Sequence, residues 1–518
     1  MKIKSVTINN FRSIQHAKIE FHDYSIIVGE NNVGKSNIID AIRYFYGDLE
    51  LTIRDWCLIN EYEPYDVWVE VEYDISPQEY NNLPKEYRIH QDKLCVRKEI
   101  DLSPVDMCKH FKSRYVCPGT NQSDRPIEDF LGEVIYVPLG DNIRHTYKSI
   151  LDKLSESIRK RIEMTKLSYK HEFSRLELQI ANELQALGIQ PHINFNSQLS
   201  QTQMSLCLEE SCCTTGTQRP VIVGYAHYSL NSQPSQTQMS LRVEEGYGLI
   251  DLTMLSTGTQ RRVIAGLIKI NAQLNEMLYG IHPIVLLYEE PEAYMHPNAI
   301  TDLAYDLRGF ARIPNQQVIA TTHSGHLVSE DIMDTRGLIR VEKQNGLTSI
   351  HQNKIPDSEL ELAKNLVYFD RPRSDMFFAK KVVLVEGPTE YMLYNYLKKR
   401  GDLPHSLTQN VTVIDTIGKW SMPYFQKILN SYNIRHSVLY DTDGDPNRPD
   451  NIAVKNEFSE LTDYSYGFPR DIETFCGIKK SGNPAINIIN KFKDGTVAKE
   501  KQAEVIEIFK NLITQKQK

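Results

Sequence analysis

A glycine-bounded segment that ends in Lys-Ser is the first place where residue types and spacing predict chemistry. It runs from Gly29 to Ser36 (GENNVGKS), after the apolar run 24–28 and before 37–45, where apolar residues recur at helical spacing. Backbone N–H groups of such a loop and the N-terminus of the following helix attract phosphate oxygens. Lys35 is expected to reach the β- and γ-phosphates, and the Ser36 hydroxyl to bind Mg²⁺. We expect a nucleoside triphosphate to be contacted by Asn31, Asn32, Gly34, Lys35, Ser36 and Asn37.

Two later apolar runs end in residues that a nucleotide hydrolase requires. The run 284–288 (IVLLY) is followed by Glu289 and Glu290. One carboxylate there can hold the Mg²⁺ shell and a second can orient the attacking water, and Glu289 and Glu290 fit these roles in that order. The run 318–322 leads to His323, which can sense or stabilise the γ-phosphate.

A Ser-and-Gly segment at 255–261 (LSTGTQR) begins a predicted helix and forms a second anion-attracting helix end. A single chain cannot easily place this helix end and its own phosphate loop on the same nucleotide. Two chains that face each other head to tail can do so. The segment therefore predicts a composite site in a homodimer or a larger homo-oligomer.

Carboxylates also follow strand-like runs in the C-terminal part. Glu386 follows the run 381–385, Glu390 lies one helical turn later, and Asp441 and Asp443 follow the run 436–440. The alternation of strand and helix predicts a parallel sheet whose strand C-termini meet at one edge. Oxygen ligands there suit Mg²⁺ or Mn²⁺, which can activate a water and stabilise a leaving oxygen in phosphodiester cleavage.

Length and composition limit what can position these groups. A chain of 518 residues can form roughly two to four domains. The net charge of −8 argues against a basic surface but leaves room for a local basic groove. No apolar run has membrane-spanning length and the N-terminus does not resemble a signal peptide, so we expect a cytoplasmic protein without a membrane partner. The spacing of the eight cysteines fits neither a disulfide framework nor a zinc template.

An internal duplication interrupts the first half. NSQLSQTQMSLCLEE at 196–210 recurs as NSQPSQTQMSLRVEE at 231–245, with twelve of fifteen positions identical. The segment TGTQR at 215–219 recurs at 257–261. A local tandem duplication, 196–224 and 231–266, is the simplest account. Because the second copy leads into a helix-like run, we expect it to be the functional one. The first copy leads into a strand-like run from 221 and is expected to form an extra hairpin or loop.

The predicted domains follow from these patterns. They are an ATPase N-terminal part (1–148), a helical insertion (149–192), an ATPase C-terminal part (193–345), a linker (346–378) and a C-terminal α/β domain (379–518). The insertion is either a dimerisation arm or a solvated helix on the body.

The order of phosphate loop, Leu-Ser-x-Gly segment, Glu-Glu strand and His strand resembles ABC-type ATPase heads. This resemblance implies that Ser256 and Gly258 contact the γ-phosphate held by the partner subunit, and that 293–297 crosses the dimer interface. The segment departs from the usual Leu-Ser-Gly-Gly-Gln at Thr257 and Thr259.

The C-terminal part resembles the Toprim fold through Glu386-Gly387 and Asp441-x-Asp443. An ABC-type head followed by Toprim is similar to the OLD (overcoming lysogenisation defect) family of ATP-dependent nucleases. The implied fold class is α/β: an N-terminal ABC-type P-loop ATPase with a helical insertion, followed by a C-terminal Toprim α/β domain with a parallel sheet.

The OLD resemblance also implies a two-metal nuclease site with a late lysine. We assign Glu386, Asp441 and Asp443 to one metal. The other set is Glu390, Asp471 and Glu473. Lys491 fits best as the lysine that stabilises transition-state charge, with Lys480 and Lys493 left open. Lys380, Lys381, Lys398, Lys399 and Arg400 are either DNA contacts or solvated charges.

The function predicted from the sequence is an ATP-regulated, metal-dependent DNA endonuclease or nickase that serves defence against phage or other foreign DNA. Its cofactors would be ATP and Mg²⁺ or Mn²⁺. A helicase-like protein or a reverse-transcriptase-associated system is the partner that the resemblance implies. Two alternatives stay open: a Toprim nuclease that cuts RNA, and a non-catalytic ATP-driven sensor or clamp for a partner effector.

Overall fold

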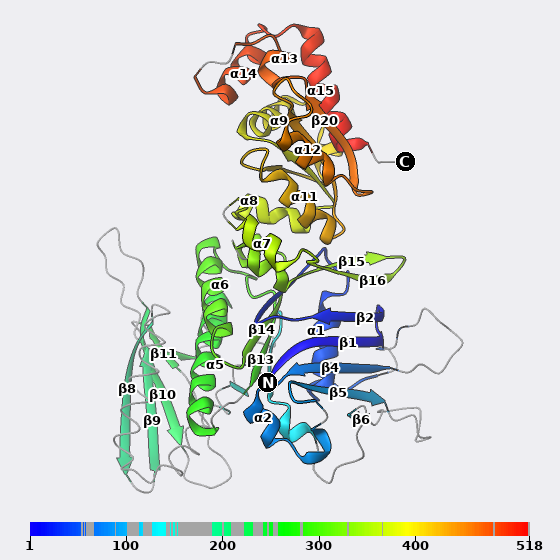
Figure 1. The fold of residues 1–518 in the computed structure, drawn as a ribbon. Helices are drawn as coiled ribbons and strands as arrows, with labels where there is room; N and C mark the ends of the chain where they lie inside the picture. Colours follow the sequence, from blue (N-terminus) through cyan, green and yellow to red (C-terminus); the bar gives the residue numbers. More distant parts are fainter. Residues whose placement is uncertain are drawn as a thin grey trace. The chain divides into compact units, whose positions relative to one another are not determined.

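The chain falls into two compact units (Figure 1). A computed structural model describes residues 1–52, 67–88, 90–100, 113–117, 127–140, 189–198, 201–208, 222–230, 242–245, 248–251, 257–279, 283–328, 331–364, 366–479 and 482–515, with single residues 55, 57, 146, 149, 150 and 153. The first unit comprises Met1–Ser25 and Ser36–Thr322, and the second comprises Ile26–Lys35 and His323–Lys518. No helix in these described ranges is both long enough and apolar enough to cross a bilayer.

An antiparallel sheet of order β2-β1-β4-β5-β6 opens the first unit. Its strands are β1 (Lys2–Phe11), β2 (Ile14–Glu20), β4 (Trp68–Asp74), β5 (Lys93–Ile100) and β6 (Ser113–Val116). Val69, Val71 and Tyr73 are buried and alternate with partly exposed residues, as in a strand with one face on a core. Helix α1 (Lys35–Phe45) packs on this sheet, where the ring centroid of Phe45 lies 6.4 Å from that of Tyr73.

Three parallel strands of the first unit position the paired glutamates. Strand β13 (Ile284–Glu289) pairs with β7 (Glu133–Val137) on one side and β14 (Gln316–Thr322) on the other. Its residues 284–288 are buried and only Glu289 is partly exposed, as the apolar run predicts. The other described α-helices of this unit are α2 (Pro77–Asn82), α5 (Thr257–Tyr279) and α6 (Pro297–Ala311).

The duplicated stretch contains strands β8 (Ile189–Gln198), β9 (Gln201–Leu208), β10 (Ile222–Leu230), β11 (Arg242–Glu245) and β12 (Gly248–Asp251). The described part of 196–210 in the first copy lies in β8 and β9, which pair as an antiparallel hairpin, and the later run contains strand β10, as the sequence predicts. The run after the second copy is helix α5. Most of the helical insertion expected over 149–192 lies outside the described residues.

The second unit contains strands of two sheets. Strand β15 (Leu338–Gln344) pairs in parallel with β3 (Tyr24–Val28) and antiparallel with β16 (Leu347–Gln352). The other sheet contains β17 (Lys381–Val385), β18 (Val411–Asp415), β19 (Arg435–Asp441) and β20 (Thr462–Phe468). The α-helices of the second unit are α7 (Asp357–Ala363), α8 (Arg371–Ser374), α9 (Pro388–Arg400), α10 (His405–Thr408), α11 (Met422–Ser431), α12 (Pro449–Asn456), α13 (Ile472–Phe475), α14 (Pro484–Lys493) and α15 (Lys499–Thr514).

The second sheet is parallel throughout, with the order β18-β17-β19-β20. This confirms the parallel sheet expected from the strand–helix alternation. From β17 the chain continues to β18 on one side, and from β18 it crosses to β19 on the other side of β17. The strand order therefore reverses between β17 and β19. Open α/β sheets bind their ligands beyond the strand C-termini at such a reversal. The topology therefore predicts a ligand site at the residues that follow Val385 and at the end of β19.

A hydrophobic core holds α9 and α15 against this sheet. Val383 and Val385 of β17 share one buried cluster with Leu393 and Leu397 of α9 and Leu512 of α15. Each fully buried Val or Leu side chain contributes roughly 1.5–3 kcal/mol relative to exposure. The packing fixes the start of α9 beside the end of β17.

Candidate functional site

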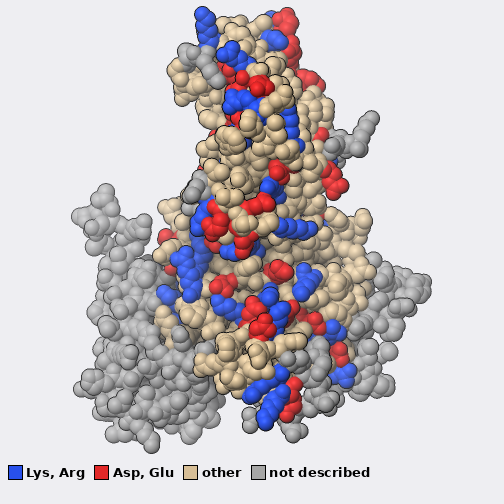
Figure 2. Space-filling view, viewed as in Figure 1, with Lys and Arg blue, Asp and Glu red and all other residues tan. Residues whose placement is uncertain are grey.

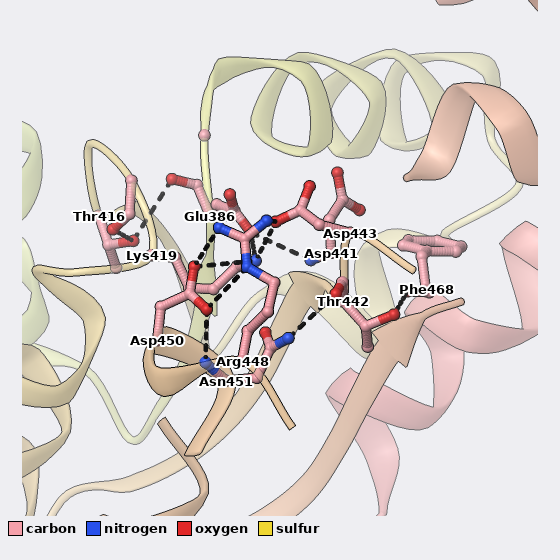
Figure 3. A network of polar contacts seen from close by, with 12 residues as sticks. Glu386, Thr416, Lys419, Asp441, Thr442, Asp443, Arg448, Asp450, Asn451 and Phe468 are labelled. Carbon is pink, nitrogen blue, oxygen red and sulfur yellow. Dashed lines mark hydrogen bonds and ion pairs between the residues drawn. The ribbon is translucent and has the colours of Figure 1, made fainter. Parts of the chain in front are cut away.

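Two acidic residues lie at the point where the strand order reverses (Figure 3). Glu386 directly follows β17, and Asp441 is the last residue of β19. The backbone N–H of Asp441 donates a hydrogen bond of 3.0 Å to Glu386 Oε2. The ends of the two central strands are therefore tied together by a carboxylate, as expected for residues at the C-terminal edge of a parallel sheet.

Three more predicted acids surround this pair. Glu390 is 4% exposed, and its Oε2 accepts a hydrogen bond of 3.1 Å from the Gly387 N–H at the start of α9. Asp471 caps α13 by accepting a 2.6 Å hydrogen bond from the Thr474 N–H, and Glu473 in the first turn of α13 is 2% exposed. Backbone groups at two helix starts therefore hold Glu390 and Asp471.

Burial and mutual repulsion raise the pKa values of two of these acids. Burial is the larger cause for Asp441, whose pKa rises to about 9 with added repulsion from Glu390, Glu386, Glu473 and Asp471. Burial is likewise the first cause for Glu390, whose pKa rises to about 8, with repulsion from Glu386 and Glu473. The neighbouring carboxyl groups are thus close enough to disfavour the ionisation of Asp441 and Glu390.

One carboxylate oxygen of Asp441 has no hydrogen-bond donor among the described residues. Its Oδ1 atom is buried and accepts no hydrogen bond from the described residues. A buried carboxylate oxygen without a donor, surrounded by other acids, has the chemistry of a cation ligand. The donor set is all oxygen, which suits Mg²⁺ or Mn²⁺. The chemistry of these residues therefore suits a divalent cation.

The cluster is not a preassembled ligand set. Within the described ranges, no three Asp, Glu, His or Cys side chains are arranged so that they could hold one metal ion. Asp443, predicted to share a metal with Asp441, is exposed in a turn where its φ is +54°. Its carboxylate lies 2.7 Å from Lys419 Nζ and 3.1 Å from Arg448 Nη1. The residues predicted to bind metal converge, but Asp443 is engaged by cationic side chains.

Lys419 is a site residue that the sequence reasoning missed. Its side chain is 3% exposed, and its Nζ lies 2.7 Å from Asp443, 3.8 Å from Glu386 and 3.7 Å from Asp450 (Figure 3). Lys419 follows β18, the strand next to β17, so a third strand end contributes to the site. A search of every strand end for cations, in addition to acids, would have found the Gly418-Lys419 turn.

Lys491, the lysine predicted for catalysis, has a different neighbour. It lies on α14, where its Nζ is 3.9 Å from Asp494. Lys493, two residues later, has its Nζ 5.8 Å from the ring of Tyr396 in the second half of α9. Tyr396 is six residues beyond Glu390, or about 9 Å farther along the helix. The structure brings Lys419, but not Lys491, into contact with the carboxylates, and Lys480 lies outside the described residues.

Among the basic residues considered for DNA contact, Lys381 has a structural role. It begins β17, at the sheet edge opposite Glu386, and its Nζ lies 3.0 Å from Asp463. Lys398, Lys399 and Arg400 occupy the last turn of α9, where positive charge favours the helix C-terminus. On the face shown in Figure 2, Lys and Arg are interspersed with Asp and Glu.

The phosphate loop has the geometry that its glycines predict. Gly29 has φ +152°, and a Cβ there would lie 2.2 Å from the backbone oxygen of Val341, so only glycine fits. Lys35 Nζ donates to the backbone oxygens of Gly29 (3.1 Å) and Glu30 (2.8 Å) and lies 2.9 Å from His323 Nε2. The structure thus places the predicted γ-phosphate histidine against the loop lysine.

The remaining predicted loop residues differ in accessibility. Asn31, Asn32 and Ser36 are exposed, so their polar groups are accessible, and Gly34 has φ +109°. Asn37 is engaged by its own unit: its Nδ2 donates to Ser13 Oγ at 2.7 Å.

The glutamates of β13 are organised by a buried arginine. Arg261 is fully buried, and its Nη1 donates to the backbone oxygens of Glu289 (3.1 Å) and Glu290 (2.8 Å). Glu289 Oε2 accepts a 2.8 Å hydrogen bond from the Tyr136 hydroxyl, and Glu290 has φ +40°. The helix that begins with the Ser-and-Gly segment therefore also braces the predicted catalytic strand end.

Gly258 lies in the first turn of α5 beside the segment predicted to cross a dimer interface. A Cβ at Gly258 would lie 3.0 Å from Met295 Cγ and 3.3 Å from the backbone oxygen of Tyr294. A larger residue would push against this backbone, so close approach explains the glycine. Ser256 lies outside the described residues.

Contacts inside the second unit join the phosphate-loop strand to the carboxylate sheet. Arg340 of β15 pairs with Val28, the residue before Gly29. Its Nη1 donates to the Tyr432 backbone oxygen at 3.0 Å and its Nη2 to that of Ala379 at 3.5 Å. Ala379 precedes β17 by two residues, so one buried side chain connects the strand before the phosphate loop to the segment that leads to Glu386.

Two family models match this chain. One describes an AAA ATPase domain and matches residues 1–197 and 69–328. The other describes an overcoming lysogenization defect protein-like TOPRIM domain and matches residues 377–443. The first match covers the phosphate loop, and the second covers Glu386, Glu390 and Asp441 of the carboxylate cluster.

Three curated proteins are similar over most of the chain. The Old nuclease of Escherichia phage P2 is 25% identical over 486 residues, covering 86% of this chain and 77% of that protein. The OLD nuclease of Thermus scotoductus is 21% identical, covering 85% of this chain and 82% of its own length. Endonuclease GajA of Bacillus cereus VD045 is 22% identical, covering 86% and 75%.

Proposed function

Because this chain belongs to the OLD family, in which an AAA-type ATPase domain is joined to an OLD-like TOPRIM domain, we propose that it is an ATP-regulated, metal-dependent DNA endonuclease or nickase. It is an enzyme with an ATPase domain and a nuclease domain, and relatives over most of its length are named nucleases. The single observation that carries the proposal is the convergence of five acids around the unpartnered Asp441 Oδ1.

We assign the cations first to the buried acids, because Asp443 is paired with Lys419 and Arg448 in this structure. Glu386, Glu390 and Asp441 would hold a first Mg²⁺ or Mn²⁺, with Asp471 and Glu473 toward a second. A divalent cation bound there would activate a water and stabilise the leaving oxygen. Asp443 remains in the proposed metal set, and its two cationic neighbours would release it when the site fills.

Lys419 supplies positive charge where the scissile phosphate would lie. Its ammonium is 2.7 Å from Asp443 and 3.8 Å from Glu386, between the proposed ligands. A positioned ammonium in a water-poor site stabilises charge that develops on phosphate oxygens. We therefore propose Lys419 for this role ahead of Lys491, the lysine chosen from the sequence.

The ATPase half would bind nucleotide through Asn31, Asn32, Gly34, Lys35, Ser36 and Asn37, with Glu289 on the metal and Glu290 and His323 at the γ-phosphate. Ser256 and Gly258 would complete the site of a second copy in a homodimer or larger assembly. The Arg340 contacts support regulation by ATP, since they join the strand before the loop to the segment before Glu386.

The domain boundaries stay as proposed from the sequence: 1–148 and 193–345 for the ATPase, 149–192 for the insertion, 346–378 for the linker and 379–518 for the Toprim domain. On the resemblance to the OLD family we also propose a role in defence against phage, with a helicase-like or reverse-transcriptase-associated partner.

A cleavage assay tests the nuclease proposal. Purified protein is incubated with supercoiled plasmid and, separately, with structured RNA, in Mg²⁺ or Mn²⁺, with and without ATP. We expect nicked or linear plasmid, and we expect Asp441→Asn to lose this product. Asp445→Asn, an exposed acid in the same turn, is the matched control and should cut normally. Cleavage of RNA alone, of neither substrate, or by Asp441→Asn at the normal rate would each reject the proposal.

A further inference from the structure

The loop between β18 and α11, residues 416–421, buries its polar side chains and exposes its apolar ones. Thr416, Lys419 and Ser421 are buried, whereas Ile417 and Trp420 are each 60% exposed. This is the reverse of the usual partition, in which apolar side chains are covered and polar ones face water. The exposed pair flanks Lys419, the lysine that contacts the carboxylate cluster.

Hydrogen bonds fix this loop to the strand that carries Glu386. Thr416 Oγ1 donates to the Val385 backbone oxygen at 3.0 Å, and the Gly418 N–H donates to the Glu386 backbone oxygen at 2.8 Å. Ser421 Oγ donates to the Gly418 backbone oxygen at 2.7 Å. The backbone on both sides of the exposed pair is therefore held at the cluster, and Figure 3 shows Thr416 and Lys419 beside Glu386.

The backbone at Ile417 is strained. Its φ is +58°, a left-handed conformation that is a genuine outlier for a β-branched residue. The conformation is kept in place by the Ile417 N–H, which donates to Asp415 Oδ1 at 2.8 Å. The backbone strain at Ile417 lowers the stability of the fold, and its exposed side chain gains nothing from burial. Strained residues of this kind are concentrated at sites of function.

We propose that Trp420 and Ile417 form a stacking surface for an unpaired nucleobase beside the phosphodiester that is cut. The inference rests on the proposed nuclease function and deepens it by naming the substrate class. Indole rings stack on every base through the base's π-face, without regard to sequence. The neighbouring Lys419 and carboxylates account for the phosphate and its metal, so the adjoining base is the part of the substrate left to cover the exposed pair.

The stacking surface favours single-stranded, frayed or gapped DNA over intact duplex. A base inside a duplex has both faces covered by its neighbours, so it must leave the stack before it can meet Trp420. Duplex DNA would bind with the added cost of unstacking. The surface would therefore distinguish an unpaired position from a paired one near the scissile bond.

Binding and fluorescence test the inference directly. Anisotropy is measured with a labelled 20-nucleotide single strand and the matching blunt duplex, in Ca²⁺, with a gel to confirm that both stay uncut. We expect Trp420→Ala to weaken single-strand binding roughly 5- to 100-fold and blunt-duplex binding less. Trp420→Phe should recover most of the affinity. Unlabelled single strand should quench the tryptophan emission of the native protein, and Trp420→Phe should lose that quenching.

Matched variants separate stacking from folding and from the nuclease proposal. Tyr305→Ala removes another exposed ring, 71% exposed on α6 in the first unit, and should leave binding unchanged. Ile417→Gly should raise the unfolding temperature, because glycine accepts the left-handed backbone, while it weakens single-strand binding.

Unaltered affinity and quenching in Trp420→Ala would overturn the stacking surface while the nuclease proposal stands. Equal losses for the single strand and the duplex would overturn the preference for unpaired bases. Absence of plasmid cleavage by the native protein would reject the nuclease proposal, yet quenching at Trp420 would still show that a base stacks there.

Discussion

The phosphate loop and the carboxylate cluster both bury charged side chains. The loop stabilises its charge with nearby backbone oxygens, whereas the cluster brings like charges together from separate segments. In the loop, Lys35 is satisfied by the backbone oxygens of Gly29 and Glu30, which lie within six residues of it. In the cluster, acids from several strand ends repel one another, and the cation near them, Lys419, comes from a fourth segment. The loop is complete within one stretch of sequence, whereas the cluster depends on how the strands are ordered.

This difference implies that the two sites fail independently. Glu290→Gln should lower ATP turnover by roughly 10³-fold, because the water would lose its orienting carboxylate, and should leave metal-dependent cleavage measurable. Asp441→Asn should do the opposite, with normal phosphate release and cleavage lowered by roughly 10³-fold. Phosphate release and plasmid nicking are measured on both proteins.

The comparison would break if either substitution abolished both activities in a protein that is still folded. Such a result would mean that the two sites operate as one catalytic unit. Asp445→Asn serves as the control for both assays, since it removes a carboxylate from the turn after Asp441.

Substitutions of Lys419 and Lys491 should differ next most strongly in their effect on cleavage. Lys419→Met should lower cleavage by roughly 10²-fold, as expected when a positioned cation is removed from developing charge, and Lys419→Arg should recover part of it. Lys491→Met should change cleavage by less than about threefold, because its described ion pair is with Asp494 near the surface. Single-turnover cleavage rates decide between them. A larger loss in Lys491→Met would restore the late lysine that the family resemblance implies.

Lys419 also shows what the sequence could and could not predict. The phosphate loop and strand β13 were predictable because a contiguous motif and a wholly apolar run report their own structure. The parallel sheet followed from alternation, and the acids at the ends of β17 and β19 followed from the sheet. The neighbour relation of β18 and β17 depends on strand order, which no local pattern reports, so the role of Lys419 became visible only in the fold.

Arg261 and the backbone conformation of Ile417 were likewise not predictable from local patterns. Arg261 was noticed only as part of a repeated TGTQR, since its hydrogen bonds reach residues 28 and 29 positions away. The left-handed backbone of Ile417 was unpredictable because sequence rules assign that conformation to Gly, Asn or Asp. Non-local partners explain Arg261, and the residues on either side of Ile417 are held by Val385 and Glu386 of another strand end.

Without a metal ion, the crowded acids should make stability fall as pH rises. The folded-state pKa of Asp441 is raised to about 9 and that of Glu390 to about 8. Between about pH 4 and pH 8 the folded chain therefore keeps protons that the unfolded chain has released, and its free energy of unfolding falls through that window. In EDTA at pH 8, Asp441→Asn should be more stable than the native protein by about 1–2 kcal/mol, with no such gain at pH 4.5.

Denaturant unfolding at the two pH values measures this effect, and Asp445→Asn should follow the native protein. Saturating Mg²⁺ should stabilise the native protein at pH 8 more than it stabilises Asp441→Asn. A gain in Asp441→Asn that is the same at both pH values would show that repulsion among ionised acids is not its cause.

The smallest expected effect concerns the link between the two regions. Arg340→Met removes the hydrogen bonds to Tyr432 and Ala379 while it keeps an apolar stem of similar length. ATP turnover and ATP-free cleavage should each stay within about threefold of normal, since neither site touches Arg340. The ratio of cleavage with ATP to cleavage without it should move toward one, by a coupling of roughly 1 kcal/mol or about fivefold.

Lys380→Met is the matched control for that link, because its ion pair with Glu30 (3.2 Å) joins the same two segments through exposed side chains. Exposed pairs of this kind contribute about 0–1 kcal/mol and are screened by salt. The ATP response should therefore survive in Lys380→Met and decrease in Arg340→Met. If both variants kept the full response, the Arg340 contacts would not carry the signal from the phosphate loop to Glu386.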